Sequence, residues 1–412
     1  MFDKEELILK DNRIKDLNIL IEKLDISQSM VENATEKYKN ISKYLASKGI
    51  DADIYPQGSF AIGTVVRPHQ DSSNKNYDLD FVCKIKSNKN HYSAKELKHM
   101  VGNALKDSGT YSEKLESEWD RCWTLVYADV NDIGFSMDIV PAVDEDEDQK
   151  NHLRLETLNP HLLDTAIALT QKNGSQYSWL TNNPKGYQDW FNTINTKIVE
   201  SQIRKYNHDN RTFYNSIEDI PENIGRTSLQ KVIQILKRHR DVYFIKRNLE
   251  NEKPISAIIT TLVANIADSV PTSNMNILEL LDYVTEELMI YSNQTHIPEL
   301  EFRSRFPHKR LIQKVNGEWI LRNPANPKDN LIDSWNSSSI NTIRFFEWID
   351  VVKKDFVSSF HEEDEMFLRG LENGLGSHFV RSSIPVHRYS TKTPSTVVHA
   401  AKPWRADNEA RR

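Results

Sequence analysis

The chain has 412 residues, 38% hydrophobic and 27% charged, which is enough to bury one or two large cores. We find no apolar run of the roughly 18 residues that a membrane span needs, and the acidic start "MFDKEELILKD" does not resemble a signal peptide, so we expect a cytoplasmic protein. A net charge of −6 argues against a protein that mainly grips duplex nucleic acid. Cys83 and Cys122 are too few for a disulfide framework and lack the CxxC spacing of a zinc site.

In the N-terminal third of the chain, the spacing of apolar residues changes from helical to strand-like. Residues 4–48 place apolar side chains at helical spacing and predict two helices, or one long broken helix, that end at Gly49. From 53 to 145, short alternating runs are separated by polar turns and by one helical stretch near 93–107. This order predicts a mixed α/β lobe with strands in the runs 53–60, 77–85, 123–130 and 133–143.

After residue 183 the chain reads as mainly helical. Helices are predicted at 186–206, 226–248, 254–268, 276–291 and 338–372, with a hairpin turn at Asn316-Gly317. The last 40 residues are rich in Gly, Ser, Thr and Pro and read as a tail with little packing power. We therefore expect an N-terminal helical segment (1–50), a catalytic lobe (51–200), a helical lobe (201–372) and a flexible tail (373–412).

Three aspartates carry the chemistry of the α/β lobe. Asp78 and Asp80 stand two apart in "NYDLDFVC", so on a strand both carboxylates project from one face. In "IGFSMDIVPAV", alternation buries Phe135, Met137 and Ile139 and sets Asp138 on the opposite face. Carboxylates brought together on adjacent strands suit Mg²⁺ or Mn²⁺. Each motif alone has a plainer interpretation, since a DxD is common at strand ends as a capping feature. The nearby acidic run 144–148 is interpreted as a solvated loop.

Two further stretches could bind phosphate. In "QGSFAIGT", Gly58 and Ser59 follow a short strand and offer free amides, an unobstructed approach and a hydroxyl. The densest basic stretch is 231–247, where Lys237 and Arg238 face away from the apolar stripe, toward solvent or toward a cleft. His239 falls on the apolar side, which favours a core histidine.

The order "QGSFAIGT", "YDLDFV", "MDIVPAV" resembles the nucleotidyltransferase fold of the DNA polymerase β type. It is most similar to the CD-NTases, bacterial relatives of cyclic GMP-AMP synthase and oligoadenylate synthase from the CBASS operons of antiphage defence. The stretches "NPKGYQDWF", "LQKVIQILKRHRDVYF", "PISAIITTLVA" and "NPANPKDNLIDSW" resemble the helical half of that family. The resemblance covers most of residues 40–372.

The resemblance implies an α+β enzyme of two lobes, with the active-site cleft between the polymerase β-like lobe and the helical lobe. Such an enzyme joins nucleoside triphosphates, ATP or GTP among them, into a cyclic di- or trinucleotide second messenger and releases pyrophosphate. Asp78, Asp80 and Asp138 would be catalytic and would hold two Mg²⁺ or Mn²⁺ ions. The nucleotide would be bound by Gln57, Gly58, Ser59, Lys237 and Ser256. The resemblance also implies an operon-encoded protein that binds the C-terminal tail, and the acidic composition implies no need for long nucleic acid.

The sequence leaves alternatives open. A template-free polymerase or tRNA nucleotidyltransferase of the same fold would share the three aspartates, although a macromolecular acceptor calls for more basic surface. A nucleotidyltransferase acting on a small molecule such as an antibiotic is disfavoured by the four matching helical stretches. A catalytically inactive nucleotide-binding scaffold is disfavoured because all three carboxylates are present.

Overall fold

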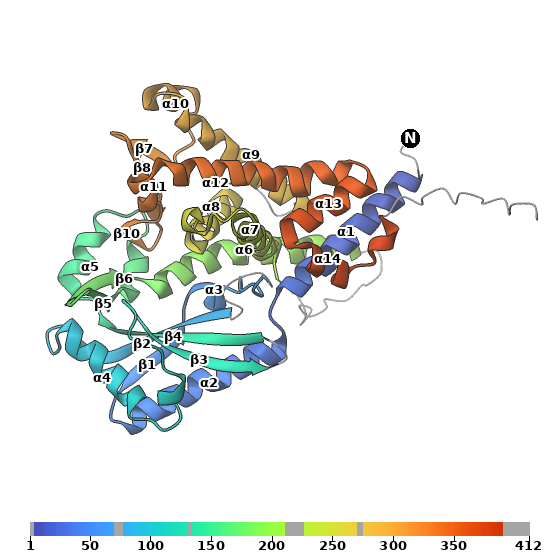
Figure 1. The fold of residues 1–412 in the computed structure, drawn as a ribbon. Coiled ribbons are helices and arrows are strands. Elements are labelled where there is room, and N and C mark those ends of the chain that lie inside the picture. Colours follow the sequence, from blue (N-terminus) through green and yellow to red (C-terminus); the bar gives the residue numbers. More distant parts are fainter. Residues whose placement is uncertain (1–3, 70–76, 131–132, 211–225, 270–274, 390–412) are drawn as a thin grey trace, which may run out of the picture.

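Two lobes are stacked in the computed structural model, with a sheet in one lobe and helices in the other (Figure 1). The structure describes residues 4–69, 77–130, 133–210, 226–269 and 275–389. One mixed sheet of six strands forms the centre of the first lobe. Its strands are β1 (Ala52–Pro56), β2 (Tyr77–Asn88), β3 (Trp123–Val130), β4 (Ile133–Asp144), β5 (Ile167–Asn173) and β6 (Gln176–Asn182).

Strand β4 organises this sheet because both of its edges are paired. One edge runs parallel to β2, with Asp80 opposite Asp138 in the register. The other edge is shared by β3, antiparallel along residues 135–139, and by β5, antiparallel along residues 142–144. Strand β1 continues the sheet beyond β2, and β6 continues it beyond β5, both antiparallel. The β2–β4 pair therefore sets the spacing between the predicted site aspartates.

The two faces of the β2–β4 pair differ in chemistry as the alternation predicted. Leu79 and Met137 are fully buried against α2 (Gln28–Ser47) and α4 (Ala94–Lys106), and they belong to one apolar core with Phe81, Phe135 and Ile139. The intervening residues of both strands point to the other face, where Asp78 and Asp80 line a cavity together with Lys237 of the helical lobe. The predicted segregation of the carboxylates from the apolar side chains is confirmed.

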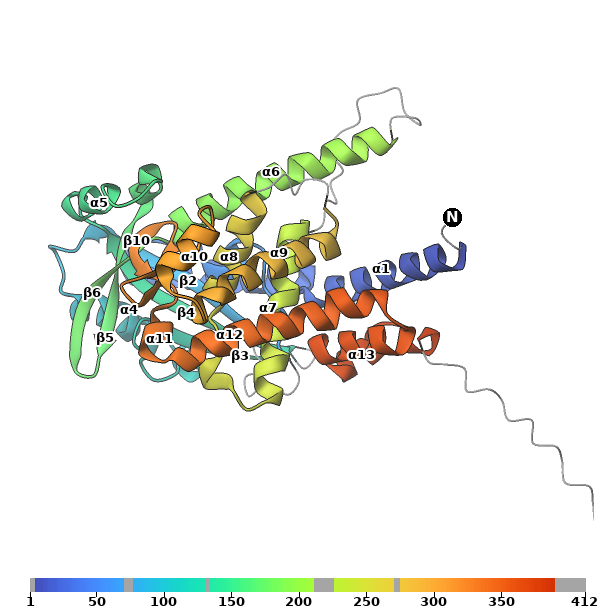
Figure 2. The ribbon, with the colours of Figure 1, turned by 90° about the horizontal axis from the view of Figure 1, so that it is seen from above.

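The helical lobe is built around α7 (Ser228–Lys246), which Figure 2 shows crossing beneath the long outer helices. Its residues 232–240 are all buried, because neighbouring helices pack on several sides. Among the described residues, no helix is long and apolar enough to cross a membrane. The other helices are α6 (Pro184–Asn210), α8 (Ser256–Asp268), α9 (Ile277–Ser292), α10 (Glu299–Arg305), α11 (Asp333–Ser337), α12 (Ser339–Val352), α13 (Asp364–Leu375) and α14 (Ser377–Ser383).

The two N-terminal helices belong to different lobes. Leu20 and Leu24 of α1 (Lys4–Leu24) are fully buried in the core of the helical lobe. Ile41 and Leu45 of α2 are buried in the core of the sheet lobe. The chain passes from one lobe to the other at Asp25, whose carboxylate accepts hydrogen bonds from Arg226. Helices α1 and α2 thus contribute to different cores.

The hairpin predicted at Asn316-Gly317 is confirmed, because β7 (Gln313–Val315) pairs with β8 (Glu318–Ile320) and both turn residues have positive φ. A second small hairpin follows, formed by β9 (Arg322–Asn323) and β10 (Asn326–Asn330). The predicted single helix 338–372 is interrupted between α12 and α13. A π-helical turn covers Lys353–Ser358, where the Ser359 hydroxyl donates to the Asp355 carbonyl at 2.6 Å.

Two sequence interpretations need correction. The acidic run 144–148 is not a simple solvated loop, because Glu145 is only 4% exposed and accepts hydrogen bonds from Lys89 and Thr181, while Asp146 caps α5 (Glu147–Arg154). Residues 377–389 also pack, since the buried Tyr389 hydroxyl donates to Asp16 at 2.7 Å. A flexible tail could therefore begin only after Tyr389, and residues 390–412 lie outside the described residues.

Candidate active site

The Gly-Ser turn lies directly against the DxD strand. Strand β1 ends at Pro56, and the backbone N–H of Gln57 donates to the carbonyl of Asp80 at 2.8 Å before the short helix α3 (Gly58–Ala61) begins. Gly58 has φ +58°, and a Cβ at this position would stand 2.9 Å from Asp80 Oδ2. Only glycine therefore fits here without strain, and it leaves room for a second molecule to approach the turn.

Two hydroxyl groups hold the carboxylates of Asp78 and Asp138 in place. The Ser136 hydroxyl donates to Asp78 Oδ1 and the Thr124 hydroxyl donates to Asp138 Oδ1, each at 2.5 Å. Each hydroxyl occupies one carboxylate oxygen, and the Cys122 thiol also forms a hydrogen bond with Asp138. Both hydroxyl groups come from strands of the same sheet, β4 and β3. The carboxylates are therefore oriented by the sheet itself rather than by loops.

The carboxylates repel one another. Burial, together with the charges of Asp138 and Asp78, raises the pKa of Asp80 to about 7. Burial also raises the pKa of Asp138, and the charge of Asp78 acts in the same direction. A bound cation would relieve both the repulsion and the desolvation.

A lysine from the helical lobe faces these carboxylates. Lys237 of α7 is 7% exposed, and its ammonium group donates to the carbonyl of Thr64 at 2.8 Å. Burial, reinforced by the charge of Arg240, lowers the pKa of Lys237 to about 7, whereas Asp241 and Asp80 oppose the shift. Arg240 donates to the hydroxyl of Ser256 at 3.0 Å and to Asp241 at 2.8 Å. The helical lobe thus brings positive charge opposite the aspartates.

A cavity of about 450 Å³ lies between the lobes and collects most of the predicted site. Its lining includes Gly58, Ser59, Asp78, Asp80, Lys237 and Ser256, together with Arg240 and Lys253. Gln57 is not part of the lining, and its backbone instead fixes the turn to β2. His239 is a core residue, as expected, bonded to Asp355 and to Trp348.

Asp138 opens into a second cavity, of about 640 Å³, which also contains Asp78. Trp119 and Arg121 line it from the loop before β3, and Gln171 lines it from β5. Trp119 is 55% exposed, and its indole N–H donates to Glu116 at 2.9 Å. The sequence analysis missed this loop, although a tryptophan between charged residues in "ESEWDRCW" was a visible signal. The two cavities adjoin at Asp78, so the carboxylates separate two spaces that could each hold a ligand.

The residues present fit a divalent cation. Hard oxygen ligands converge from β2 and β4, and the raised pKa of Asp80 records a local excess of negative charge. Within the described part of the chain, no group of three or more His, Cys, Asp or Glu side chains is arranged to hold a metal ion unaided. Mg²⁺ is usually bound by one or two carboxylates together with phosphate oxygens and water, which agrees with this partial ligand set.

The fold is that of the nucleotidyltransferases of the polymerase β type. A model of the Second Messenger Oligonucleotide or Dinucleotide Synthetase domain matches residues 13–195. This segment is therefore similar to that domain family. A protein named c-di-GMP synthase, from Roseivirga ehrenbergii, is 28% identical over 366 residues, covering 85% of this chain and 82% of the relative.

Solved CD-NTase structures share the fold across both lobes. The Bradyrhizobium diazoefficiens CD-NTase CdnG, solved with GTP, matches with a TM-score of 0.62 and 16% identity, over 90% of this chain and 98% of that one. The Escherichia coli MS115-1 CdnC, in its complex with HORMA-deltaN, matches with a TM-score of 0.58 and 14% identity, covering 88% and 96%. Vibrio cholerae DncV, solved with the linear intermediate pppA(3′,5′)pG, gives 0.53 and 14%, covering 94% and 93%. The predicted resemblance to the CD-NTases and the predicted two-lobed fold are confirmed.

Proposed function

We propose that this chain joins two nucleoside triphosphates into a cyclic dinucleotide through the residues between its lobes, as a second-messenger synthase of antiphage defence. The observation that carries the proposal is the register of β2 and β4, which pairs Asp80 with Asp138. Asp78, two residues before Asp80, lines both cavities. The c-di-GMP synthase relative supports a product that contains guanine.

The cavity between the lobes is the proposed site of the donor triphosphate. Gly58 leaves its surface open, the Ser59 hydroxyl can donate to a phosphate oxygen, and Lys237 can supply counter-charge from the opposite lobe. Arg240 holds the hydroxyl of Ser256 at the rim and is itself neutralised by Asp241, so we assign it a positioning role.

The second cavity is the proposed site of the acceptor nucleotide. The exposed Trp119 ring can stack on a base, and the acceptor ribose would then lie beside Asp78 and Asp138. The Asp138 carboxylate, whose pKa burial raises, accepts the proton of the attacking hydroxyl. A new bond forms between that oxygen and the α-phosphorus, the α–β phosphoanhydride bond breaks, and pyrophosphate leaves on the Gly58-Ser59 side. A second transfer closes the ring.

Divalent ions supply positive charge to the triphosphate and the attacking oxygen. We propose two ions, Mg²⁺ or Mn²⁺, held by Asp78, Asp80 and Asp138. The pairing in the register and the raised pKa of Asp80 support this assignment. Occupancy can be measured directly, because Mn²⁺ bound to the wild type should be lost in a variant that carries Asp78→Asn and Asp80→Asn.

The decisive experiment incubates the purified full-length chain with all four ribonucleoside triphosphates and Mg²⁺, digests with phosphatase, and identifies the resistant products by mass spectrometry. A mass equal to that of c-di-GMP or another cyclic dinucleotide supports the proposal. Linear or RNA-linked products alone would instead support the template-free polymerase alternative. The Asp138→Asn variant serves as the catalytic control, and Asp189→Asn, an exposed change on α6, serves as the matched surface control.

We further propose a regulatory protein partner that contacts residues 390–412. The CdnC structure is a complex with a second protein, HORMA-deltaN, which supports the presence of a protein partner. Deletion of residues 390–412 leaves the packed Tyr389 in place and should preserve turnover while removing partner binding. Loss of turnover on the same deletion would show that the segment belongs to the enzyme's fold.

A further inference from the structure

The four residues that follow the Gly-Ser helix, 62–65, lie between the two lobes. Ile62 is buried in the core of the helical lobe, and Val65 is buried in the core of the sheet lobe. Gly63 lies between them with φ +68°, and a Cβ at this position would stand 2.6 Å from Gln230 Nε2 of α7. The segment is therefore packed closely against the helical lobe.

The same segment is tied back to the Gly-Ser turn by its backbone. The N–H of Ile62 donates to the carbonyl of Gly58 at 3.3 Å. The N–H of Thr64 donates to the carbonyl of Ser59 at 2.9 Å. A displacement of the segment would thus be passed on to the turn beside the aspartates.

One face of α7 carries a row of donors that reach the carbonyl groups of this segment. Gln230 Nε2 donates to the carbonyl of Ile62 and Gln234 Nε2 donates to that of Val65, each at 2.9 Å. The third member of the row is Lys237, whose bond to the segment is described above. Positions spaced by four and then three residues lie on the same side of a helix. Three successive donors of α7 therefore hold one short stretch of the other lobe's backbone.

Two details indicate that these bonds fix the turn rather than only stabilise the fold. A fourth donor comes from a different helix, since Gln188 Nε2 of α6 donates to the carbonyl of Ala61 at 3.3 Å. Gln234 is fully buried, yet its Oε1 has no hydrogen-bond partner among the described residues. A buried amide with one unpaired oxygen costs stability, so its presence calls for another explanation.

We propose that the three glutamines that donate to the carbonyl groups of residues 61–65 are positioning residues of the reaction. They fix the Gly58-Ser59 turn relative to Lys237. The inference rests on the proposed function, in which Ser59 and Lys237 bind one triphosphate from opposite lobes. A misplacement of about 1 Å at such a site can cost about 100-fold in rate, so the two halves of the phosphate site need a rigid link.

Two variants remove a donor while keeping the volume of the side chain. Gln234→Met loses the bond to Val65 but also removes the unpaired Oε1, so we expect it to fold with a melting temperature close to that of the wild type. Gln188→Met removes the donor to Ala61 from a half-buried position on α6, where a change of side chain endangers folding less.

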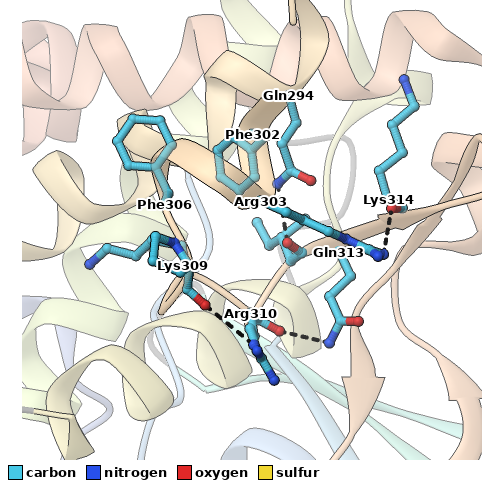
Figure 3. Close-up of a pocket in the computed structure, with 10 residues that line it drawn as sticks. Gln294, Phe302, Arg303, Phe306, Lys309, Arg310, Gln313 and Lys314 are labelled. Carbon is cyan, nitrogen blue, oxygen red and sulfur yellow. Dashed lines mark hydrogen bonds between the residues drawn. The ribbon is translucent and has the colours of Figure 1, made fainter. Parts of the chain in front are cut away.

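The matched control is Gln294→Met. Gln294 is 4% exposed and its Nε2 donates to the carbonyl of Ile312 at 3.1 Å, so the control removes the same kind of buried bond. Figure 3 shows Gln294 in a separate pocket of the helical lobe, of about 360 Å³. None of the residues that line this pocket lines either cavity beside the aspartates.

Hydrogen exchange read by mass spectrometry, on the full-length chain without nucleotide, measures how firmly the turn is held. Peptides spanning 57–66 should exchange about threefold faster or more in Gln234→Met and in Gln188→Met than in the wild type. Calorimetry with the α,β-methylene analogues of ATP and GTP measures the consequence for the triphosphate. The dissociation constant should rise about two- to tenfold in both variants, the effect of one hydrogen bond, and should not change in Gln294→Met. In turnover assays the KM should rise by the same factor with little change in kcat, which a general loss of stability would not produce.

Three outcomes would overturn the inference. One is exchange at 57–66 in Gln234→Met at the rate of the wild type. Another is a dissociation constant that stays unchanged in both variants. The third is an equally large loss of affinity in Gln294→Met, which would show that any lost buried bond has this effect. The proposed function is tested separately, by binding of the analogues to the wild type and by its products, because the exchange measurement needs no nucleotide.

Discussion

Replacing Asp80 by asparagine should stabilise the metal-free protein while abolishing turnover. The wild-type carboxylate has a pKa of about 7 against an ordinary value of 3.8, so the folded state disfavours its charged form. Because the folded pKa is raised, the carboxyl's contribution to stability is fully present below about pH 4 and is lost as the pH rises toward 7. Above that pH, the folded wild type carries the penalty of a partly desolvated charge that is repelled by Asp138 and Asp78.

The size of the effect follows from the shift. About three pKa units at 1.36 kcal/mol each give an upper limit of about 4 kcal/mol. Asp80 is half-buried and partly screened by water, so we expect Asp80→Asn to raise the free energy of unfolding near pH 8 by about 1–3 kcal/mol. At roughly 2–4 °C per kcal/mol, the melting temperature should rise by several degrees. The difference should shrink steadily between pH 7 and pH 4.

Thermal melts in EDTA at several pH values measure this difference, with Asp189→Asn as the control for a surface carboxylate. Added Mg²⁺ should raise the melting temperature of the wild type and should affect Asp80→Asn much less, since the cation then takes over the neutralisation. A variant that melts below the wild type near pH 8, or a difference that does not change with pH, would refute the electrostatic reasoning. Normal turnover by Asp80→Asn would refute the metal assignment.

Four further changes test individual parts of the site. Gly58→Ala should lower turnover by about 100-fold, measured by steady-state kinetics. The new Cβ would stand 2.9 Å from Asp80 Oδ2, at a backbone φ of +58°, and would displace that carboxylate. Ser59→Ala should raise the KM for nucleotide about tenfold with little change in kcat, since one hydroxyl to a charged phosphate is lost. Lys237→Met should keep its circular dichroism spectrum, because the side chain is buried and of similar length, yet raise the same KM by about tenfold or more. Trp119→Ala, at a 55% exposed position, should leave the melting temperature unchanged but raise the KM about tenfold through lost base stacking; a normal KM would remove Trp119 from the acceptor site.

The local sequence pattern was sufficient to predict the part of the candidate site that lies on the sheet lobe. The two-residue period of β2 and β4 separates aspartates from core residues within each strand, and a parallel pairing then brings Asp80 opposite Asp138. The Gly58-Ser59 turn was likewise visible, because glycine followed by a polar residue after a strand marks an open turn. The alternation within each strand and the turn depend on neighbours in sequence, whereas the pairing of β2 with β4 joins strands that are far apart in the chain.

The parts that the sequence did not predict depend on contacts across the chain. Lys237 donates to the carbonyl of Thr64, which lies 173 positions earlier in the chain. The position of Lys237 on the helical wheel could not tell whether its side chain faces solvent or a cavity. Glu145 looked solvated because its neighbours are acidic, but Lys89 and Thr181 reach it from other elements.

The contacts of α1 have a consequence for the synthesis of the protein. Arg13 bonds to the carbonyl of Phe360 and to Asp364, Lys23 bonds to the carbonyl of Ser383, and Asp16 accepts from Tyr389, across 347 to 373 positions. At about 5–20 residues per second, a ribosome needs roughly 20 to 70 s to make the partners of a helix that emerges first. These polar contacts of α1 therefore form only when nearly the whole chain has been made, and a chaperone that shields this one helix would protect the nascent chain during that interval.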